Sequence, residues 1–408
     1  MAKQVIKKGA TVRQGGLAAF KAQKGLVYEP GKSKITASTT NADKEMDWLV
    51  MPKAFQDATK LPGIPIGYST CVMGHSNTGK STLINHAIVA AQRQDIIPVI
   101  IDTENAFSFE YAVAMGFHAT PIRDDVEIET VNDETGEVTK EIKNMIVNWD
   151  KADGYGDFLY YNSSTLIEQY GNYDYSTGKE TVTYRNSAVI EDVAACINDI
   201  LKAQREGMID KPILFIWDSV GSVKSFQSYN AKGGGNKMWD AAAISASFED
   251  IVGEKIPSSR KVSSKYTNTF LYVNKVWMDH MTNPIGPATM KTKGGDSLTY
   301  KTRLQIVMGG KLTAGIKKLS ATAKGAKYSF GIETKIRVEK NHLNAPYNIT
   351  YEGPIIATDM GFVAVDDLDE YKKEHVSRIL KELQEASNNY SIEADDISYT
   401  SEEENSDD

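Results

Sequence analysis

The feature that most constrains this chain is a glycine-rich octapeptide, Gly74-His75-Ser76-Asn77-Thr78-Gly79-Lys80-Ser81, between an apolar run and a helical pattern. It matches the pattern G-x-x-x-x-G-K-[ST]. The glycines let the backbone wrap closely, so that its amides face phosphate oxygens. Lys80 would reach the outer phosphates, Ser81 would offer a hydroxyl to Mg²⁺, and the helix N-terminus favours an anion. The sequence therefore predicts a phosphate-binding loop that ends at Thr82. A chance match on a glycine-rich turn is disfavoured because a strand and a helix flank the loop.

Acidic residues follow two other apolar runs. The run 213–217 is followed by Asp218, which would hold Mg²⁺ or its water at the carboxyl edge of a parallel sheet. The run 98–101 is followed by Asp102 and Glu104. A carboxylate near a terminal phosphate can orient and deprotonate an attacking water. Asp102 and Glu104 lie on the same face of an extended segment, so the residues alone leave the choice between them open. The alternative is a solvated strand end.

Strands and helices alternate through the first part of the chain. Short runs rich in β-branched or aromatic residues predict buried strands, and longer amphipathic patterns between them predict helices. The predicted strands are 69–73, 98–101, 213–217 and 269–273, and the predicted helices are 80–94 and 188–205. This alternation predicts an α/β fold with a mainly parallel sheet covered by helices on both faces. After Gly294, consecutive strands at 304–308, 330–338 and 349–351 predict an added antiparallel part.

Three domains are predicted. The first, residues 1–45, would be an N-terminal arm with a short helix around 17–24. The second, residues 46–365, would be the ATPase core. The third, residues 366–408, would be a C-terminal helix with an acidic, disordered tail. The core would carry an inserted hairpin at 127–147, and the final helix would span 369–386.

Composition excludes several classes of protein. Two cysteines cannot make a disulfide framework or a four-cysteine zinc site. No run of 18 uncharged apolar residues is present, so no membrane span or membrane partner is expected. The N-terminus has no apolar signal-peptide core, which favours a cytoplasmic location.

Charge is unevenly distributed. The last 16 residues hold eight acids and no Lys or Arg, and without them the chain's 54 acids fall to 46, equal to its 46 bases. Residues 297–332 hold seven Lys or Arg and no acid. A basic stretch with an acidic tail suits a protein that binds a polyanion and screens itself from it. The alternative is a solvated surface with a solubilising tail.

The sequence resembles the RecA-type strand-exchange ATPases through most of residues 46–365. The phosphate loop is followed in order by segments that resemble family motifs. They are Ile101-Asp102-Thr103-Glu104-Asn105-Ala106 with Tyr111, Ile216-Trp217-Asp218-Ser219-Val220, Leu271-Tyr272-Val273-Asn274-Lys275-Val276, Gly294-Gly295-Asp296-Ser297-Leu298 and Thr334 to His342 with Ala345-Pro346-Tyr347. The short C-terminal part is closest to the recombinases of large bacteriophages.

The resemblance implies roles at the nucleotide. Glu104, rather than Asp102, would activate water, and Tyr111 would stack on adenine, although it could instead be a helix residue that packs on the sheet. Lys340 would reach across a subunit interface to the γ-phosphate. Two positions depart from the bacterial pattern: Lys275 replaces a glutamine that senses the γ-phosphate, and His342 replaces a second nucleotide-binding lysine.

The resemblance also implies two DNA-binding loops, Gly221–Trp239 and Trp277–Ser297. Lysines near glycines suit a phosphate backbone, and apolar side chains can stack on bases. The alternative for either loop is a flexible surface segment. The expected DNA-binding residues are Lys224, Lys232, Lys237, Trp277, Met278, Lys291, Lys293, Gly294 and Gly295.

The implied function is an ATP- and Mg²⁺-dependent DNA recombinase. It would form helical filaments on single-stranded DNA and promote homologous pairing and strand exchange with double-stranded DNA. Mediator and single-strand-binding proteins would be its further partners, in the host cytoplasm if the chain is phage-encoded. One alternative is a RecA-like hexameric helicase or another P-loop DNA motor. Another is a regulatory paralogue that binds nucleotide and turns it over poorly.

Overall fold

The computed structural model describes residues 42–131, 138–231, 237–279, 289–292, 295–310, 314–323, 325–386 and 397–403. The predicted helix at 17–24, most of the predicted N-terminal arm and residues 132–137 of the predicted inserted hairpin therefore lie outside the described residues. Within the described ranges no helix is long and apolar enough to cross a membrane.

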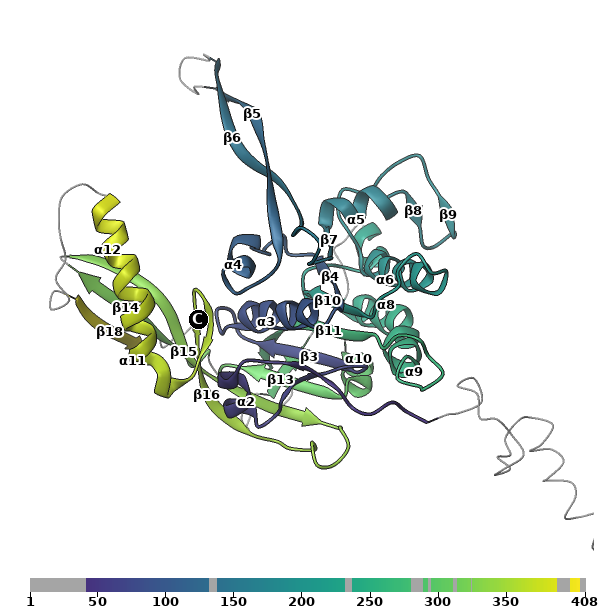
Figure 1. Cartoon of the computed structure of the whole chain (residues 1–408). Helices are drawn as coiled ribbons and strands as arrows, with labels where there is room; N and C mark the ends of the chain where they lie inside the picture. Colours follow the sequence, from purple (N-terminus) through teal and green to yellow (C-terminus); the bar gives the residue numbers. More distant parts are fainter. Residues whose placement is uncertain are drawn as a thin grey trace, which may run out of the picture.

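A 12-stranded sheet forms the centre of the described structure (Figure 1). Its main path runs β17-β16-β15-β13-β3-β11-β10-β4-β7. The strands from β13 to β7 pair in parallel, and their bounds are β13 (Leu304–Met308), β3 (Ser69–Gly74), β11 (Thr269–Asp279), β10 (Ile213–Asp218), β4 (Ile97–Asp102) and β7 (Leu159–Asn162). The predicted α/β fold with a mainly parallel sheet is confirmed.

Helices cover both faces of this sheet because successive strand residues point to opposite sides. On one face, Val72, Leu214 and Leu271 pack in a cluster that includes α3 (Lys80–Arg93) and α2 (Lys53–Thr59). On the other face, Cys71, Phe215 and Phe270 pack with α6 (Ile190–Arg205) and α8 (Lys237–Asp250). Apart from β7 at the end of the sheet, whose residues are half-buried, the parallel strands are buried on both faces. This burial explains why they appear in the sequence as continuous apolar runs.

Smaller elements complete the core. They are β1 (Trp48–Val50), β2 (Gly63–Pro65), α4 (Phe109–Ala114), α5 (Ser163–Tyr170), β8 (Tyr173–Asp174), β9 (Lys179–Glu180), α7 (Phe226–Asn230), the π-helix η2 (Ile251–Lys255), α9 (Ile256–Ser258), β12 (Thr289–Thr292) and α10 (Gly295–Lys301).

The inserted hairpin is longer than predicted. Strands β5 (Ala119–Val131) and β6 (Val138–Lys151) pair with each other in an antiparallel two-stranded sheet that projects from the core (Figure 1). The side chains of β6 are exposed or half-buried along its whole length.

The predicted antiparallel part lies beside β13. It comprises β15 (Ala326–Asn341), β16 (Glu352–Thr358), β17 (Gly361–Val363) and β14 (Lys317–Ala323). The strand predicted at 349–351 is wrong, because the ladder begins only at Glu352. The Asn341 amide nitrogen donates to the carbonyl oxygens of Tyr347 and Ile349, at 2.7 and 2.8 Å, and so holds this segment as a loop.

The predicted disorder of the acidic tail is wrong for residues 397–403. These residues form β18 (Ile397–Glu403), which pairs with β14 over seven residues. Hydrophobic packing explains the difference: Ile397 packs on a cluster that includes Phe330, Tyr371 and Leu380. The predicted final helix is present as η3 (Val365–Asp367), α11 (Leu368–Tyr371), the π-helix η4 (Lys372–Val376) and α12 (Ser377–Ala386).

We expect β18 to contribute to stability. Truncation after Asn389 removes its backbone pairing with β14 and the packing of Ile397, so the midpoint of thermal unfolding should fall. Each kcal/mol lost lowers that midpoint by roughly 2–4 °C in domains of about 150–250 residues, and by less in a larger one. Truncation after Glu403 keeps the strand while removing Glu404, Asp407 and Asp408, and is the matched control. Equal midpoints for the two truncations, measured by calorimetry, would contradict a structural role for β18.

Candidate nucleotide site

The glycine-rich loop connects β3 to α3 at the carboxyl edge of the parallel strands. Gly79 has φ +89°, where L side chains are strained, and a Cβ on Gly74 would lie 2.2 Å from the Met308 carbonyl oxygen. Thr78 is buried, and its hydroxyl donates to the His75 carbonyl oxygen at 2.9 Å. The glycines therefore permit a turn and a close backbone approach that other residues would obstruct.

Lys80 lies over this loop. Its ammonium group donates to the carbonyl oxygen of Gly74 at 3.1 Å and to that of His75. Burial lowers the pKa of Lys80, while Asp218 and Glu104 oppose the shift. The His75 Nε2 atom is buried and has no hydrogen-bond partner among the described residues. Phosphate oxygens could replace the loop carbonyls as acceptors for Lys80, and an acceptorless buried nitrogen in the same loop fits a site built for a ligand.

Asp102 and Glu104 have different surroundings. Asp102 is 1% exposed, and its carboxylate accepts hydrogen bonds from the backbone N–H groups of Glu104 and Phe107 and from the Tyr160 hydroxyl, at 3.1, 2.8 and 3.1 Å. These donors fix the turn after β4. The side chain of Glu104 is 23% exposed and reaches toward Ser219 and Lys275. The geometry thus leaves Glu104, and not Asp102, accessible to a water.

Asp218 ends β10 directly beside Asp102, with which it is in register. Burial raises the pKa of Asp218 to about 7, and the neighbouring carboxylates of Glu104 and Asp102 add to the shift. Lys80 and Lys275 oppose it. Because ionisation of Asp218 is costly in the ligand-free protein, a cation placed next to this carboxylate would stabilise its charged form strongly.

Lys275 joins this cluster from β11, where it is in register with Gly74. Its ammonium group lies 3.1 Å from the Glu104 carboxylate, and its side chain is 54% exposed. Glu104 also accepts a hydrogen bond from the Ser219 hydroxyl. An ion pair this exposed contributes little net stability, so it can exchange partners at low cost.

The side-chain oxygens near the phosphate loop show whether this site could hold Mg²⁺. The predicted ligands are the Ser81 hydroxyl, exposed at the start of α3, and the Asp218 carboxylate at the end of β10. Among the described residues no three His, Cys, Asp or Glu side chains cluster as a metal site. Mg²⁺ commonly uses one or two protein oxygens together with phosphates and waters, so this donor set fits the ion.

A cavity of about 400 Å³ adjoins the phosphate loop. Residues 77–82 line one side, and segments of β15 and β16 from 329–332 and 357–359 line the other. Tyr111 lies at this junction, since its hydroxyl donates to the Thr358 carbonyl oxygen at 2.8 Å and lies 2.8 Å from the Thr82 hydroxyl. The cavity has the size of a small-molecule site, and stacking of adenine on Tyr111 stays a prediction.

Lys340 and His342 lie apart from this cluster. Lys340 pairs with Gln305 on β13, which in turn lies beside Cys71 on β3. Strand spacings place Lys340 about 10 Å back along the strands from Gly74 and about 10 Å across them. Its ammonium group donates to the Thr299 and Tyr300 carbonyl oxygens, both at 2.9 Å. His342 is exposed just beyond β15. Neither residue reaches the phosphate loop of its own chain.

The two predicted DNA-binding segments follow β10 and β11, so they leave the sheet at the nucleotide edge. The described parts of both segments include helix or strand residues, and their binding to DNA stays a prediction. The first contains α7, with Lys224 exposed before it and Lys237 at the start of α8. In the second, Trp277 and Met278 lie on β11 and are in register with Lys291 and Met290 on β12, while Gly295 begins α10. Lys232, Lys293 and Gly294 lie outside the described residues.

Sequence reasoning missed the residues that join the two acidic strand ends. The Thr103 backbone N–H donates to the Asp218 carbonyl oxygen at 2.8 Å, and Trp217 Nε1 donates to the Thr103 hydroxyl at 3.1 Å. Ser219, which holds Glu104, was also missed. Thr103 directly follows Asp102, and Ser219 directly follows Asp218. Their place next to a predicted site carboxylate is the sequence feature that could have identified them.

Comparison with known proteins agrees with this arrangement. The RecA N-terminal domain family matches residues 27–155. The RecA protein of Desulforapulum autotrophicum is 34% identical over 94 residues, which is 23% of this chain and 25% of that protein. The RecA protein of Aquifex aeolicus is 34% identical over 96 residues, 23% of this chain and 26% of that protein. The chain thus aligns with about a quarter of the length of these relatives.

Fold and site together define an α/β core with a P-loop motif at the carboxyl edge of its parallel strands. The predicted resemblance to the RecA-type recombinases is confirmed, and the matching segment contains the phosphate loop, Glu104 and Tyr111. The bacteriophage type stays a prediction.

We expect Glu104→Gln to keep nucleotide binding and to lower ATP turnover about 100-fold or more, the range of a lost general base. The change preserves size and removes the carboxylate. Asp102→Asn is the contrasting variant, and it should destabilise the fold because three donors surround that carboxylate. Steady-state hydrolysis and equilibrium nucleotide binding measure the difference. Near wild-type turnover by a folded Glu104→Gln protein would contradict the assignment.

Asp218 should make stability depend on pH. Its pKa is raised from 3.8 to about 7, so the folded chain holds a proton between these values that the unfolded chain releases. Stability without ligand should therefore fall as the pH rises from about 4 to 7. Asp218→Asn removes this loss, so its gain over wild type, measured by urea unfolding, should be larger at pH 8 than at pH 5. An equal gain at both pH values would refute the raised pKa.

Proposed function

We propose that this protein is an ATP-dependent DNA recombinase that forms helical filaments on single-stranded DNA and promotes pairing and strand exchange with double-stranded DNA. One observation carries the proposal. The phosphate loop, Glu104 and Asp218 meet at the sheet edge from which both DNA-binding segments emerge, whereas Lys340 lies elsewhere in the same chain.

The nucleotide chemistry follows from the side chains at this edge. ATP would place its phosphates on the loop amides and on Lys80, with its base in the cavity beside Tyr111. Mg²⁺, held by Ser81 and Asp218, would supply charge neutralisation at the phosphates. Glu104 would orient a water toward the terminal phosphate and accept its proton.

Lys275 would couple the nucleotide to DNA. In the ligand-free protein its ammonium group pairs with Glu104. A γ-phosphate would compete for this exposed lysine and free Glu104 to act on water. Because Lys275 and Trp277 lie on the same strand, β11, a shift of the lysine would be transmitted to the second DNA-binding segment.

Lys340 would complete the site of a neighbouring subunit. Its ammonium group is held by carbonyl oxygens of its own chain, away from its own phosphate loop. In a filament, each nucleotide would lie between one subunit's loop and the next subunit's lysine. Residues 1–45 would form an arm for subunit contact. Residues 46–365 would form the ATPase core, and residues 366–408 would form a C-terminal unit. Mediator and single-strand-binding proteins would be further partners, and the cytoplasm the site of action.

A mixing experiment tests the shared site. Glu104→Gln and Lys340→Ala proteins should each be nearly inactive alone. An equal mixture on single-stranded DNA should recover up to about a quarter of wild-type turnover, because random mixing places an intact loop beside an intact lysine at one interface in four. Mixing Glu104→Gln with Lys80→Ala is the matched control and should recover nothing, because both changes affect the same loop face. Equal recovery in both mixtures would contradict an intersubunit role for Lys340.

Electron microscopy with single-stranded DNA and ATP tests the assembly. The proposal predicts helical filaments. Closed rings would instead indicate a hexameric DNA motor, and the absence of any assembly would indicate a nucleotide-binding paralogue without recombinase activity.

A further inference from the structure

Among the described residues that line the cavity beside the phosphate loop, Asp359 supplies the only carboxylate. This half-buried residue lies in the turn between β16 and β17, and it lines the cavity together with residues 77–82 of the loop. An ionised carboxylate only accepts hydrogen bonds, so it cannot bind a phosphate oxygen. A ligand group that binds Asp359 therefore has to be a hydrogen-bond donor.

Two tyrosine hydroxyls hold this carboxylate in place. The Tyr371 hydroxyl, from α11, donates to Oδ1, and the Tyr328 hydroxyl, from β15, donates to Oδ2. Tyr371 is buried and Tyr328 is half-buried. A carboxylate oxygen can accept a second hydrogen bond, so each oxygen keeps an acceptor site. Because the two donors come from separate elements, they fix the plane of the group, and Asp359 presents two acceptor sites side by side in a preorganised position.

The turn that carries Asp359 is hydrogen-bonded to the helix that follows the phosphate loop. The Phe362 backbone N–H donates to His86 Nε2, on α3, at 2.8 Å. Burial lowers the pKa of His86 to about 4, so its ring is neutral and can accept this bond at neutral pH. A Cβ on Gly361 would lie 2.7 Å from the same nitrogen, and the φ of Gly361 is +113°. The backbone therefore holds Asp359 at a fixed separation from the loop.

The position of Asp359 relative to bound phosphates follows from Tyr111. The Tyr111 hydroxyl lies 2.8 Å from the Thr82 hydroxyl, in the first turn of α3, and donates to the Thr358 carbonyl oxygen at 2.8 Å. Thr358 directly precedes Asp359. Burial raises the pKa of Tyr111, and the charge of Asp359 adds to the shift, which places the carboxylate close to that hydroxyl. One phenol group thus links the end of the phosphate loop to the residue before Asp359. In a nucleotide, the group attached directly to the α-phosphate is the ribose.

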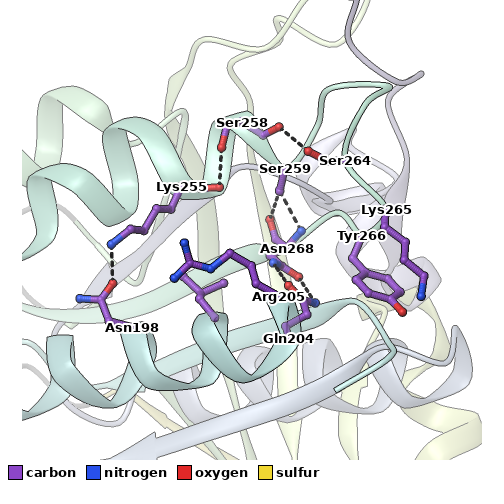
Figure 2. Close-up of a pocket in the computed structure, with 11 residues that line it drawn as sticks. Asn198, Gln204, Arg205, Lys255, Ser258, Ser259, Ser264, Lys265, Tyr266 and Asn268 are labelled. Carbon is purple, nitrogen blue, oxygen red and sulfur yellow. Dashed lines mark hydrogen bonds between the residues drawn. The ribbon is translucent and has the colours of Figure 1, made fainter. Parts of the chain in front are cut away.

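A larger cavity, of about 450 Å³, lies elsewhere in the fold (Figure 2). Its lining comes from α6, η2, α9 and residues between 259 and 268, and includes none of residues 74–82. Figure 2 shows hydrogen bonds between its own side chains, such as those of Gln204 and Asn268. Of these two cavities, only the one beside the loop can receive the sugar of a nucleotide whose phosphates lie on the loop.

We propose that Asp359 accepts hydrogen bonds from the 2′- and 3′-hydroxyls of the ribose and so makes the site selective for ribonucleotides. Two vicinal hydroxyls match the two acceptor sites of one carboxylate, and an acidic side chain binds a ribose hydroxyl in dinucleotide-binding folds too. The amino group of adenine can direct only one N–H toward a carboxylate and would leave the other oxygen without a donor. This role of Asp359 rests on the proposed function, because it takes a nucleotide as the ligand of the phosphate loop.

Titration calorimetry of the full-length chain with ADP and with 2′,3′-dideoxy-ADP, both with Mg²⁺, tests the proposal without turnover. Wild type should bind ADP at least about tenfold more tightly, which is the range of hydrogen bonds to a charged group. Asp359→Ala should make the two affinities equal, and Asp359→Asn, which keeps one neutral acceptor, should give an intermediate ratio. Asp366→Asn is the matched control. It removes an exposed carboxylate in η3, outside the cavity lining, and should keep the wild-type ratio.

Several outcomes would overturn the role of Asp359. They are equal affinities of wild type for the two nucleotides, a wild-type ratio in Asp359→Ala, and a ratio in Asp366→Asn that falls as far as in Asp359→Ala. If Asp359→Ala does not fold, a wild-type ratio in Asp359→Asn has the same meaning. A change in the preference for ADP over GDP, with the sugar ratio unchanged, would assign the carboxylate to the base instead. Wild-type protein that binds neither nucleotide would contradict the nucleotide site itself, whereas binding without sugar discrimination would contradict only the role of Asp359.

Discussion

Repulsion among three carboxylates at one sheet edge is the constraint on which the rest of this site depends. Parallel pairing of β4 and β10 puts Asp102 beside Asp218, and the turn after β4 adds Glu104. Burial raises the pKa of Asp218 to about 7, and the neighbouring carboxylates of Glu104 and Asp102 add to the shift. Different groups stabilise each carboxylate. Backbone N–H groups donate hydrogen bonds to Asp102, and Lys275 and Ser219 contact Glu104. The positive charge of Lys80 favours the ionised form of Asp218. A bound cation would offset this negative charge, so cation binding and the protonation of Asp218 are linked.

The parallel sheet also separates functions in space. Its carboxyl edge carries the phosphate loop and both predicted DNA-binding segments. Lys340 lies about 10 Å back along the strands, away from the phosphate loop of its own chain. The antiparallel strands beyond β13 wall the nucleotide cavity, and β18 covers the outer edge of β14.

Much of this architecture could be predicted from the sequence because its determinants are local. The phosphate loop follows from glycine conformation, and the buried strands follow from continuous apolar runs. The different surroundings of Asp102 and Glu104 could not be predicted from the sequence, because both side chains lie on the same face of an extended segment. The difference arises because the Tyr160 hydroxyl and the Phe107 backbone N–H donate hydrogen bonds to the Asp102 carboxylate, and only the fold brings Tyr160 to this position. The strand β18 was hidden by its acidic composition, since its pairing with β14 and the contact of Ile397 outweigh the charge.

A double-mutant cycle of Glu104→Gln and Lys275→Gln, read out as ATP turnover with single-stranded DNA, tests the central claim most directly. The two side chains form one unit, with atoms 3.1 Å apart. Residues in direct contact give non-additive effects, whereas independent residues give additive ones. The account predicts that Lys275→Gln changes turnover several-fold in the wild-type background and has almost no effect once Glu104 is changed. Equal fold-changes in both backgrounds would show that Lys275 does not act through Glu104 and would contradict the account.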